Sequence, residues 1–161
     1  MKKMIVIAGI TAFFLACSGN SSDAKKEDGA NPEVAAKAGD DQQKKERDAK
    51  RGIGKFTNVE VSPALDAAKA EAGLAIYDMK CSSCHKLTDE RLVGPGWKDV
   101  TTRRTPEWIM NFSTNPDEML QKDPEAQAML EICMIRMPNQ SLSDIDARNV
   151  FEFMRKNDGV K

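Results

Sequence analysis

The residues with the clearest chemical meaning lie in one pentapeptide, Cys81-Ser82-Ser83-Cys84-His85. Two thiols at this spacing can each add across one vinyl group of the same porphyrin edge, and a histidine directly after the second thiol then lies beneath the ring with its Nε2 facing the iron. The only histidine of the chain and two of its four cysteines are in this motif. The pentapeptide therefore predicts one covalently attached haem, held by Cys81 and Cys84, with His85 as an iron ligand.

Three other uses of the same residues stay open at this point. A thioredoxin-like dithiol follows a strand in a βαβ unit, whereas the residues before Cys81 have a helical pattern. A zinc site of three cysteines and a histidine could recruit Cys133, although the adjacent Cys84 and His85 reach one tetrahedral ion poorly. A disulfide between Cys81 and Cys84 is compatible with an oxidising compartment, but it leaves His85 without a role.

The segments around the motif are predicted to be helical, and no strand pattern competes with them. We expect a first helix over residues 64–80 with Pro63 at its first position, and a loop over residues 86–105. Pro106 should open a short helix that stops before Asn115-Pro116. A helix over residues 125–136 should end before Pro138, and Ser143 with Asp146 should open a last helix that reaches Asn157. The predicted fold is all-α, with four to five helices around the haem.

With these elements in order, residues 70–158 resemble the class I cytochrome c family. Gly73 and Tyr77 match the family's first helix, where a glycine and an aromatic residue cross the last helix, and Phe153 stands at the matching aromatic position. Gly94-Pro95 matches the family's glycine-proline pair, which implies that the Pro95 carbonyl accepts a hydrogen bond from His85 and raises its basicity.

The sequence departs from the family after Pro95. Trp97 stands at a usual leucine site and Asp99 at a usual glycine site. We expect the indole N–H of Trp97 to reach a haem propionate. Arg103 and Arg104 are further candidates for that role, although both could equally be solvated.

The second axial ligand is expected to be Met137. Because the only histidine is already used, bis-histidine ligation within the chain is excluded, which leaves methionine, lysine, Cys133, water or an open position. Met137 directly precedes Pro138 between the last two predicted helices, and this resembles the family's ligand loop. Met134 is the alternative. Cys133 is expected to be a small buried apolar residue.

The N-terminus is predicted to be a lipoprotein signal and a tether. Residues 1–17 combine two early lysines with a short apolar run that ends at Cys17, which resembles the lipobox of bacterial lipoproteins and implies lipidation of Cys17. A signal peptide cleaved near Ala16, or an uncleaved anchor, is the alternative. Residues 23–51 contain 16 charged residues out of 29, so we expect residues 18–62 to be a disordered linker and residues 63–161 to be the domain.

A six-coordinate haem with histidine and methionine ligands has no open position for a substrate, and methionine raises the reduction potential. The sequence therefore predicts a monomeric electron carrier rather than an enzyme, with transient redox donors and acceptors and a membrane contact through Cys17. The expected location is the bacterial periplasm, at the outer membrane. The near-balanced charge, 24 Lys and Arg against 25 Asp and Glu, gives no argument for nucleic acid.

Two functions other than electron carrier, and one narrower resemblance, are also compatible with the sequence. The chain could be a haem subunit of a larger reductase or oxidase, or a five-coordinate haem sensor or peroxidase-like enzyme. Residues 93–157 also resemble the monohaem cytochromes encoded beside bacterial nitrous-oxide reductase, above all in residues 106–119 and 131–140. That resemblance implies electron delivery to that reductase.

Overall fold

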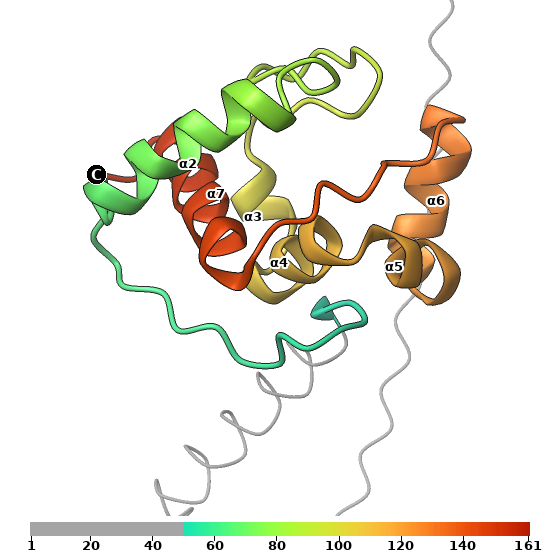
Figure 1. The fold of residues 1–161 in the computed structure, drawn as a ribbon, viewed down its shortest axis with the longest axis horizontal. Helices are drawn as coiled ribbons and strands as arrows, with labels where there is room; N and C mark the ends of the chain where they lie inside the picture. The colour runs from blue at the N-terminus through green and yellow to red at the C-terminus, as the bar shows by residue number, and fades with distance from the viewer. Residues whose placement is uncertain (1–49) are drawn as a thin grey trace, which may run out of the picture.

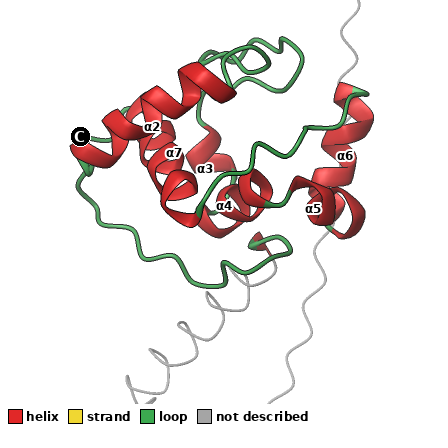
Figure 2. Cartoon of the chain, in the orientation of Figure 1, coloured by secondary structure: helices red, strands yellow, loops and turns green. Residues whose placement is uncertain are grey.

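The computed structural model describes residues 50–161 of the chain. Within this part the chain is helical, and its only β pairing is an isolated bridge between His85 and Arg91 (Figures 1 and 2). None of the described helices is long and apolar enough to cross a bilayer. The predicted signal peptide, the lipidated Cys17 and the linker as far as residue 49 lie outside the described residues. The helices are α2 (Ala67–Lys80), α3 (Val100–Arg103), α4 (Pro106–Thr114), α5 (Pro116–Lys122), α6 (Pro124–Cys133) and α7 (Asp144–Asn157).

The first and last helices, α2 and α7, cross in close contact and form the frame of the fold (Figure 1). A Cβ atom at Gly73 would lie 2.0 Å from the Asn149 carbonyl oxygen of α7, so only glycine lets the two backbones approach this closely. Tyr77 then packs on Phe153, with 5.4 Å between ring centroids. The helix crossing expected from the resemblance is confirmed, and with it the small all-α fold.

Two helices, α4 and α7, begin with the residues that the sequence predicts. The Ser143 side chain accepts a hydrogen bond from the Asp146 N–H, and the Asp146 carboxylate accepts one from the Ser143 N–H, which is a complete capping box at the start of α7. Thr105 caps α4, and Pro106 occupies its first turn as expected.

Two helix boundaries differ clearly from the prediction. The first helix begins at Ala67 and not at residue 64, because the Asp66 carboxylate accepts from the Lys69 N–H and caps the helix there. The helix before Met137 ends at Cys133, where Met134 takes a left-handed conformation with φ 59° and turns the chain away. Pro138 therefore does not terminate α6.

Two short helices, α3 and α5, were not expected. Asn115 was interpreted as a stop, but its side chain also accepts a hydrogen bond from the Glu118 N–H and begins α5. Proline at the first position of α5 is favourable because its missing N–H has no partner there in any helix.

Residues 51–63, hereafter the strap, lie along the domain in an extended course below α4 and α7 (Figure 1). We expected residues up to 62 to belong to the disordered linker, and for residues 51–62 the structure corrects this. The Asn111 side chain bonds the Phe56 N–H and C=O, at 2.9 Å each, and the buried Glu107 carboxylate accepts from the Val59 N–H at 2.7 Å. These two side chains of α4 pair backbone groups that the strap cannot pair itself.

Candidate functional site

The pentapeptide forms a tight turn at the end of α2. The Cys81 N–H bonds the Tyr77 carbonyl at 2.9 Å, which closes the helix, and the Cys84 and His85 N–H groups then both bond the Cys81 carbonyl, at 3.0 and 2.9 Å. This turn places Cys81, Cys84 and His85 on the wall of one cavity. The spacing of the motif therefore brings both cysteines and His85 to the same cavity, and their roles in holding a haem stay predictions.

The His85 ring is fixed by the chain that returns from residues 86–93. Its Nδ1 lies 2.8 Å from the Pro95 carbonyl oxygen, and because a carbonyl only accepts, Nδ1 carries the proton and Nε2 is left for a ligand. The Gly94 backbone lies against the ring, since a Cβ there would be 2.4 Å from Cε1. The structure thus places Pro95 where the resemblance implied.

Burial sets the protonation of these groups. It lowers the pKa of His85, against the opposing effect of the hydrogen bond to Pro95, so the neutral imidazole that metals bind is favoured. Burial also raises the pKa of the Cys81 thiol to about 11, with Lys80 opposing the shift and Cys84 adding to it. Near neutral pH Cys81 is therefore protonated.

The cavity has a volume of about 360 Å³ and lies between the pentapeptide, α4 and the loop after α6. Met137 is part of its lining, whereas Met134 is not and is 85% exposed. Cys133 is half-buried and also lines the cavity, so it is less enclosed than expected. The roles of Met137 and Met134 as ligands stay predictions, although of these two residues only Met137 lines the cavity.

Trp97, Arg103 and Arg104 also border the cavity. Trp97 is buried and packs on the His85 ring, with 5.5 Å between centroids. The Arg103 guanidinium donates to the backbone carbonyls of Gly96 and Lys98. Arg104 stacks over Trp108 and pairs with Glu125. Both arginines are therefore held by the protein at the edge of the cavity.

Two hydrogen bonds that join the pentapeptide side of the cavity to the Met137 side could not be predicted from the sequence. The Lys80 ammonium donates to the Gln140 carbonyl at 2.8 Å and joins the end of α2 to the Met137 loop. The Arg91 guanidinium donates to the Ile132 carbonyl at 2.6 Å and joins the loop after His85 to the end of α6. Basic residues at such positions are usually solvated, so sequence reasoning had no signal for either contact.

The residues present fit a covalently bound haem better than the other uses considered for the pentapeptide. Cys81, Cys84 and Cys133 are free thiols, so the structure has no disulfide between Cys81 and Cys84. No cluster of three or more histidine, cysteine or acidic side chains within residues 50–161 could hold a metal ion, which removes the zinc site. Two thiols, a neutral imidazole with a free Nε2 and a methionine instead share one largely apolar cavity.

Comparison with known proteins gives one family and one group of structures. The family model "Cytochrome c" matches residues 70–158. A cytochrome c from Rhodothermus marinus has a TM-score of 0.66 and 34% sequence identity, over 70% of this chain and 96% of that one. An engineered form of the Rhodothermus marinus cytochrome c matches with a TM-score of 0.65, and the same engineered form bound to a carbene intermediate matches with 0.63; each is 34% identical over 70% of this chain and 97% of its own. No curated protein matches the chain.

Proposed function

The chain belongs to the cytochrome c family, and on that premise we propose that it is a periplasmic, membrane-anchored carrier of single electrons in a respiratory chain. Membership means that it holds one covalently bound c-type haem and acts as a haem-based electron carrier. We further propose that Cys81 and Cys84 form the two thioether bonds and that His85 and Met137 are the axial ligands. The observation that carries this proposal is that all four side chains line one cavity.

When bound, the haem supplies an iron that gains and loses one electron. The residues of the protein keep the surroundings of that iron fixed. Pro95 keeps the Nδ1 proton of His85 in place, which fixes the direction of Nε2. Lys80 and Arg91 join the two sides of the cavity through backbone carbonyls. Such ties limit rearrangement between the oxidised and reduced states, which favours rapid transfer.

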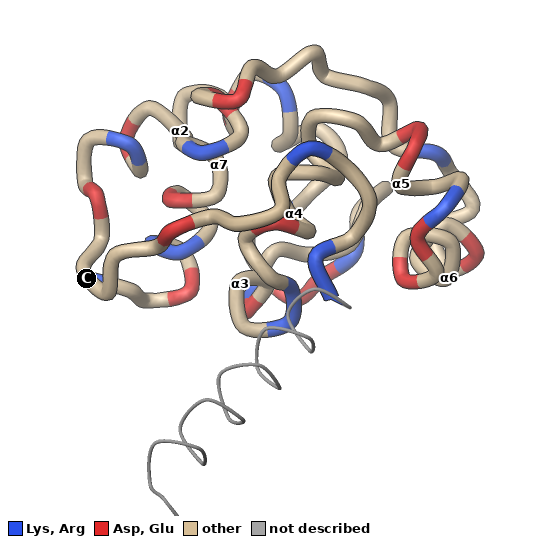
Figure 3. Tube along the Cα trace, turned by 90° about the horizontal axis from the view of Figure 1, so that it is seen from below, with Lys and Arg blue, Asp and Glu red and all other residues tan. Residues whose placement is uncertain are grey.

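The proposed contact with redox partners is an apolar surface around the cavity. Within residues 50–161, six of the seven exposed large apolar side chains come from the segments beside the pentapeptide and beside Met137, and three of these line the cavity. Positive and negative residues are interspersed along the trace (Figure 3). A small apolar contact surface suits a weak, transient partner. The six are Met79, Leu92, Val93, Ile132, Met134 and Ile135.

Replacement of Met137 by alanine tests whether the protein is an electron carrier with a six-coordinate haem or a sensor or enzyme with a five-coordinate one. We expect Met137→Ala to abolish the near-infrared sulfur-to-iron charge-transfer band of the ferric protein and to lower the midpoint potential, because methionine ligation favours the ferrous state. Met134→Ala is the matched control and should keep both properties. If Met137→Ala retains the band, Met137 is not the ligand. If Met134→Ala loses it, the ligand is Met134.

The proposed carrier is anchored at the outer membrane and delivers electrons to nitrous-oxide reductase. The match of residues 1–17 to a lipobox supports lipidation of Cys17, attachment to the outer membrane and action of a monomeric carrier on the periplasmic side. Lipid chains anchor through buried methylenes, each worth about 0.8 kcal/mol. The resemblance of residues 93–157 to cytochromes encoded beside nitrous-oxide reductase supports that reductase as the electron acceptor.

Replacement of Cys17 tests the anchor. In the native host, we expect Cys17→Ser to move the holoprotein from the membrane fraction to the soluble fraction or to block its processing. Cys133→Ser should leave the distribution unchanged. Fractionation followed by haem staining measures both. A Cys17→Ser protein that is processed normally and stays with the membrane would contradict lipid anchoring.

A further inference from the structure

The ring of His85 is in contact with a line of aromatic side chains that no part of the proposed function uses. Trp97 lies 5.5 Å from His85 between ring centroids, with the planes inclined by 37°. On its other side Trp97 lies 5.0 Å from Tyr77, inclined by 55°. These are ordinary contact distances for paired rings. Trp97 and Tyr77 are 6% and 7% exposed, so both rings are buried.

Tyr77 also holds the backbone of His85. Its hydroxyl donates to the His85 carbonyl at 2.7 Å. Tyr77 itself is fixed in the crossing of α2 and α7 through its contact with Phe153. The backbone N–H of Trp97 donates to the Lys86 carbonyl at 2.8 Å, which ties the tryptophan to the residue directly after His85. The crossing of α2 and α7 is thus connected to His85 twice, through the backbone by the Tyr77 hydroxyl and through the ring by Trp97.

We propose that Trp97 and Tyr77 are positioning residues that set the rotation of the His85 imidazole plane. This inference rests on the proposed function, in which His85 is the axial ligand. The Pro95 carbonyl holds one atom of the ring, Nδ1. A single hydrogen bond leaves the ring able to rock about that contact, whereas packing of Trp97 against the ring resists this rotation. Fixing the plane keeps the Nδ1–H···O bond short and the imidazole a strong donor.

This role differs from the one expected from the sequence, a hydrogen bond from the Trp97 indole N–H to a haem propionate. The two roles use different parts of the same side chain. Phenylalanine keeps an aromatic ring and loses the N–H, whereas leucine loses both. Trp97→Phe and Trp97→Leu therefore separate ring packing from hydrogen bonding.

The test uses the ferric and ferrous holoprotein. The g values of a low-spin ferric haem depend on the orientation of its axial ligand planes, so electron paramagnetic resonance reports the rotation of His85 directly. We expect Trp97→Leu to shift the g values and to raise the midpoint potential, because a looser Nδ1–H···O bond makes a weaker donor. Trp97→Phe should match the wild type. Tyr77→Phe, which loses only the hydroxyl bond to the His85 carbonyl, should shift the g values in the same direction by a smaller amount.

Two results would overturn the inference. One is a Trp97→Leu protein with the g values and midpoint potential of the wild type. The other is a Trp97→Phe protein whose g values and potential are shifted as far as those of Trp97→Leu, which would assign the effect to the indole N–H. Trp97→Met repeats the test if the leucine variant does not fold. A wild-type protein without covalent haem, or without the sulfur-to-iron band, marks failure of the proposed function. With both present, unmoved g values in Trp97→Leu mark failure of the positioning role alone.

Discussion

Replacing both Cys81 and Cys84 by serine is expected to yield a chain that keeps no haem after denaturation. Both cysteines line the cavity and neither is engaged in a disulfide, so each is available for one thioether bond. A hydroxyl does not form that bond. Haem staining of a denaturing gel, with the mass of the intact chain, measures the loss. Because haem must fill the centre of a domain with few aromatic residues of its own, the double variant should also lose most of its cooperative unfolding transition.

Matched variants separate attachment from folding. Cys133→Ser changes the third free thiol of the described chain, which lines the same cavity, and it should retain covalent haem in full. Cys84→Ser alone should keep haem through the one remaining bond at Cys81, with an altered absorption spectrum. Covalent haem in the Cys81→Ser, Cys84→Ser protein would refute attachment at this motif.

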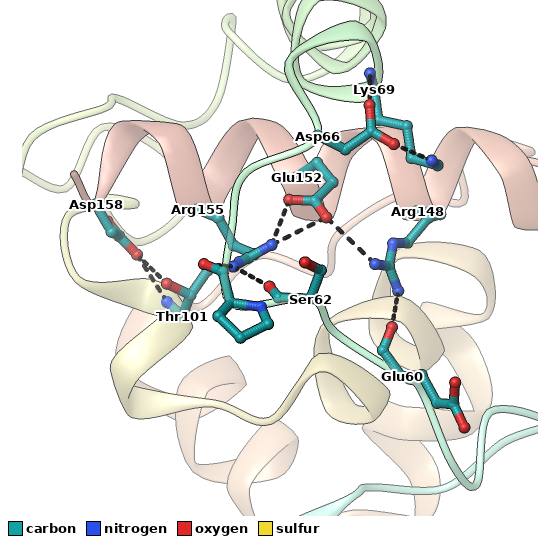
Figure 4. Close-up of polar contacts among 10 residues, drawn as sticks. Glu60, Ser62, Asp66, Lys69, Thr101, Arg148, Glu152, Arg155 and Asp158 are labelled. Carbon is teal, nitrogen blue, oxygen red and sulfur yellow. Dashed lines mark hydrogen bonds and ion pairs between the residues drawn. The ribbon is translucent and has the colours of Figure 1, made fainter. Parts of the chain in front are cut away.

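The second large effect is expected at Arg155, which joins α7 to the strap (Figure 4). Its guanidinium donates to both carboxylate oxygens of Glu152, at 3.0 and 2.8 Å, and to the Ser62 and Pro63 carbonyls, at 2.7 and 3.2 Å. Arg155 and Glu152 are 6% and 1% exposed. Arg155→Met leaves a buried carboxylate with Arg148 as its remaining partner, and such a loss costs about 3–5 kcal/mol. The whole domain has a free energy of unfolding of about 5–15 kcal/mol.

Guanidinium unfolding of the holoprotein, followed by far-ultraviolet circular dichroism, measures this loss. Lys156→Met is the control, because the neighbouring lysine is half-exposed and its contact with Glu71 is long, at 3.8 Å. Its expected change is about 0–1 kcal/mol. Adding Glu152→Met to Arg155→Met should restore part of the stability, since the uncompensated charge is then gone. Trypsin should also cleave Arg155→Met faster after Lys55, in the strap. Equal stability of Arg155→Met and Lys156→Met would contradict the role of the buried pair.

The parts of the fold marked by local side-chain chemistry could be predicted from the sequence. Ser143 and Asp146 determine the start of α7, and Gly73 with Phe153 determines the crossing of α2 and α7. The end of α6 could not be predicted, because Met134 turns the chain in a left-handed conformation and methionine carries no mark for it. Asn115 was interpreted only as a stop because the same residue type both ends and begins helices.

The strap shows a different limit. It is held through its own backbone by side chains of α4 and α7, so the sequence of the strap does not reveal its partners. One signal was present: Ile53, Phe56, Val59 and Val61 follow a charged segment that has almost no bulky apolar residues, and all four pack against the core. The segment was assigned to the linker because of the charged composition of residues 23–51, which says nothing about these four residues.

The parts of the candidate site whose residues are close together in the sequence could be predicted. The pentapeptide alone indicates the haem, and resemblance places Pro95 and Met137. The packing of Trp97 on His85 depends on the return of residues 86–97 to the pentapeptide, a tertiary contact with no sequence pattern. The structural match also covers a larger share of the chain than residues 63–161 provide. The relatives therefore share part of the chain before Pro63.

The strap has a mechanical consequence. Within residues 50–161, tension applied at residue 50 first meets the hydrogen bond from the Thr105 hydroxyl to the Lys50 carbonyl. The load then meets the hydrogen bonds of Asn111, Glu107, Arg148 and Arg155 in turn before it reaches Asp66 and the start of α2. Since α2 ends at Cys81, these hydrogen bonds lie along the chain between residue 50 and the haem-binding turn. Tension applied at residue 50 is therefore expected to load them before it loads that turn.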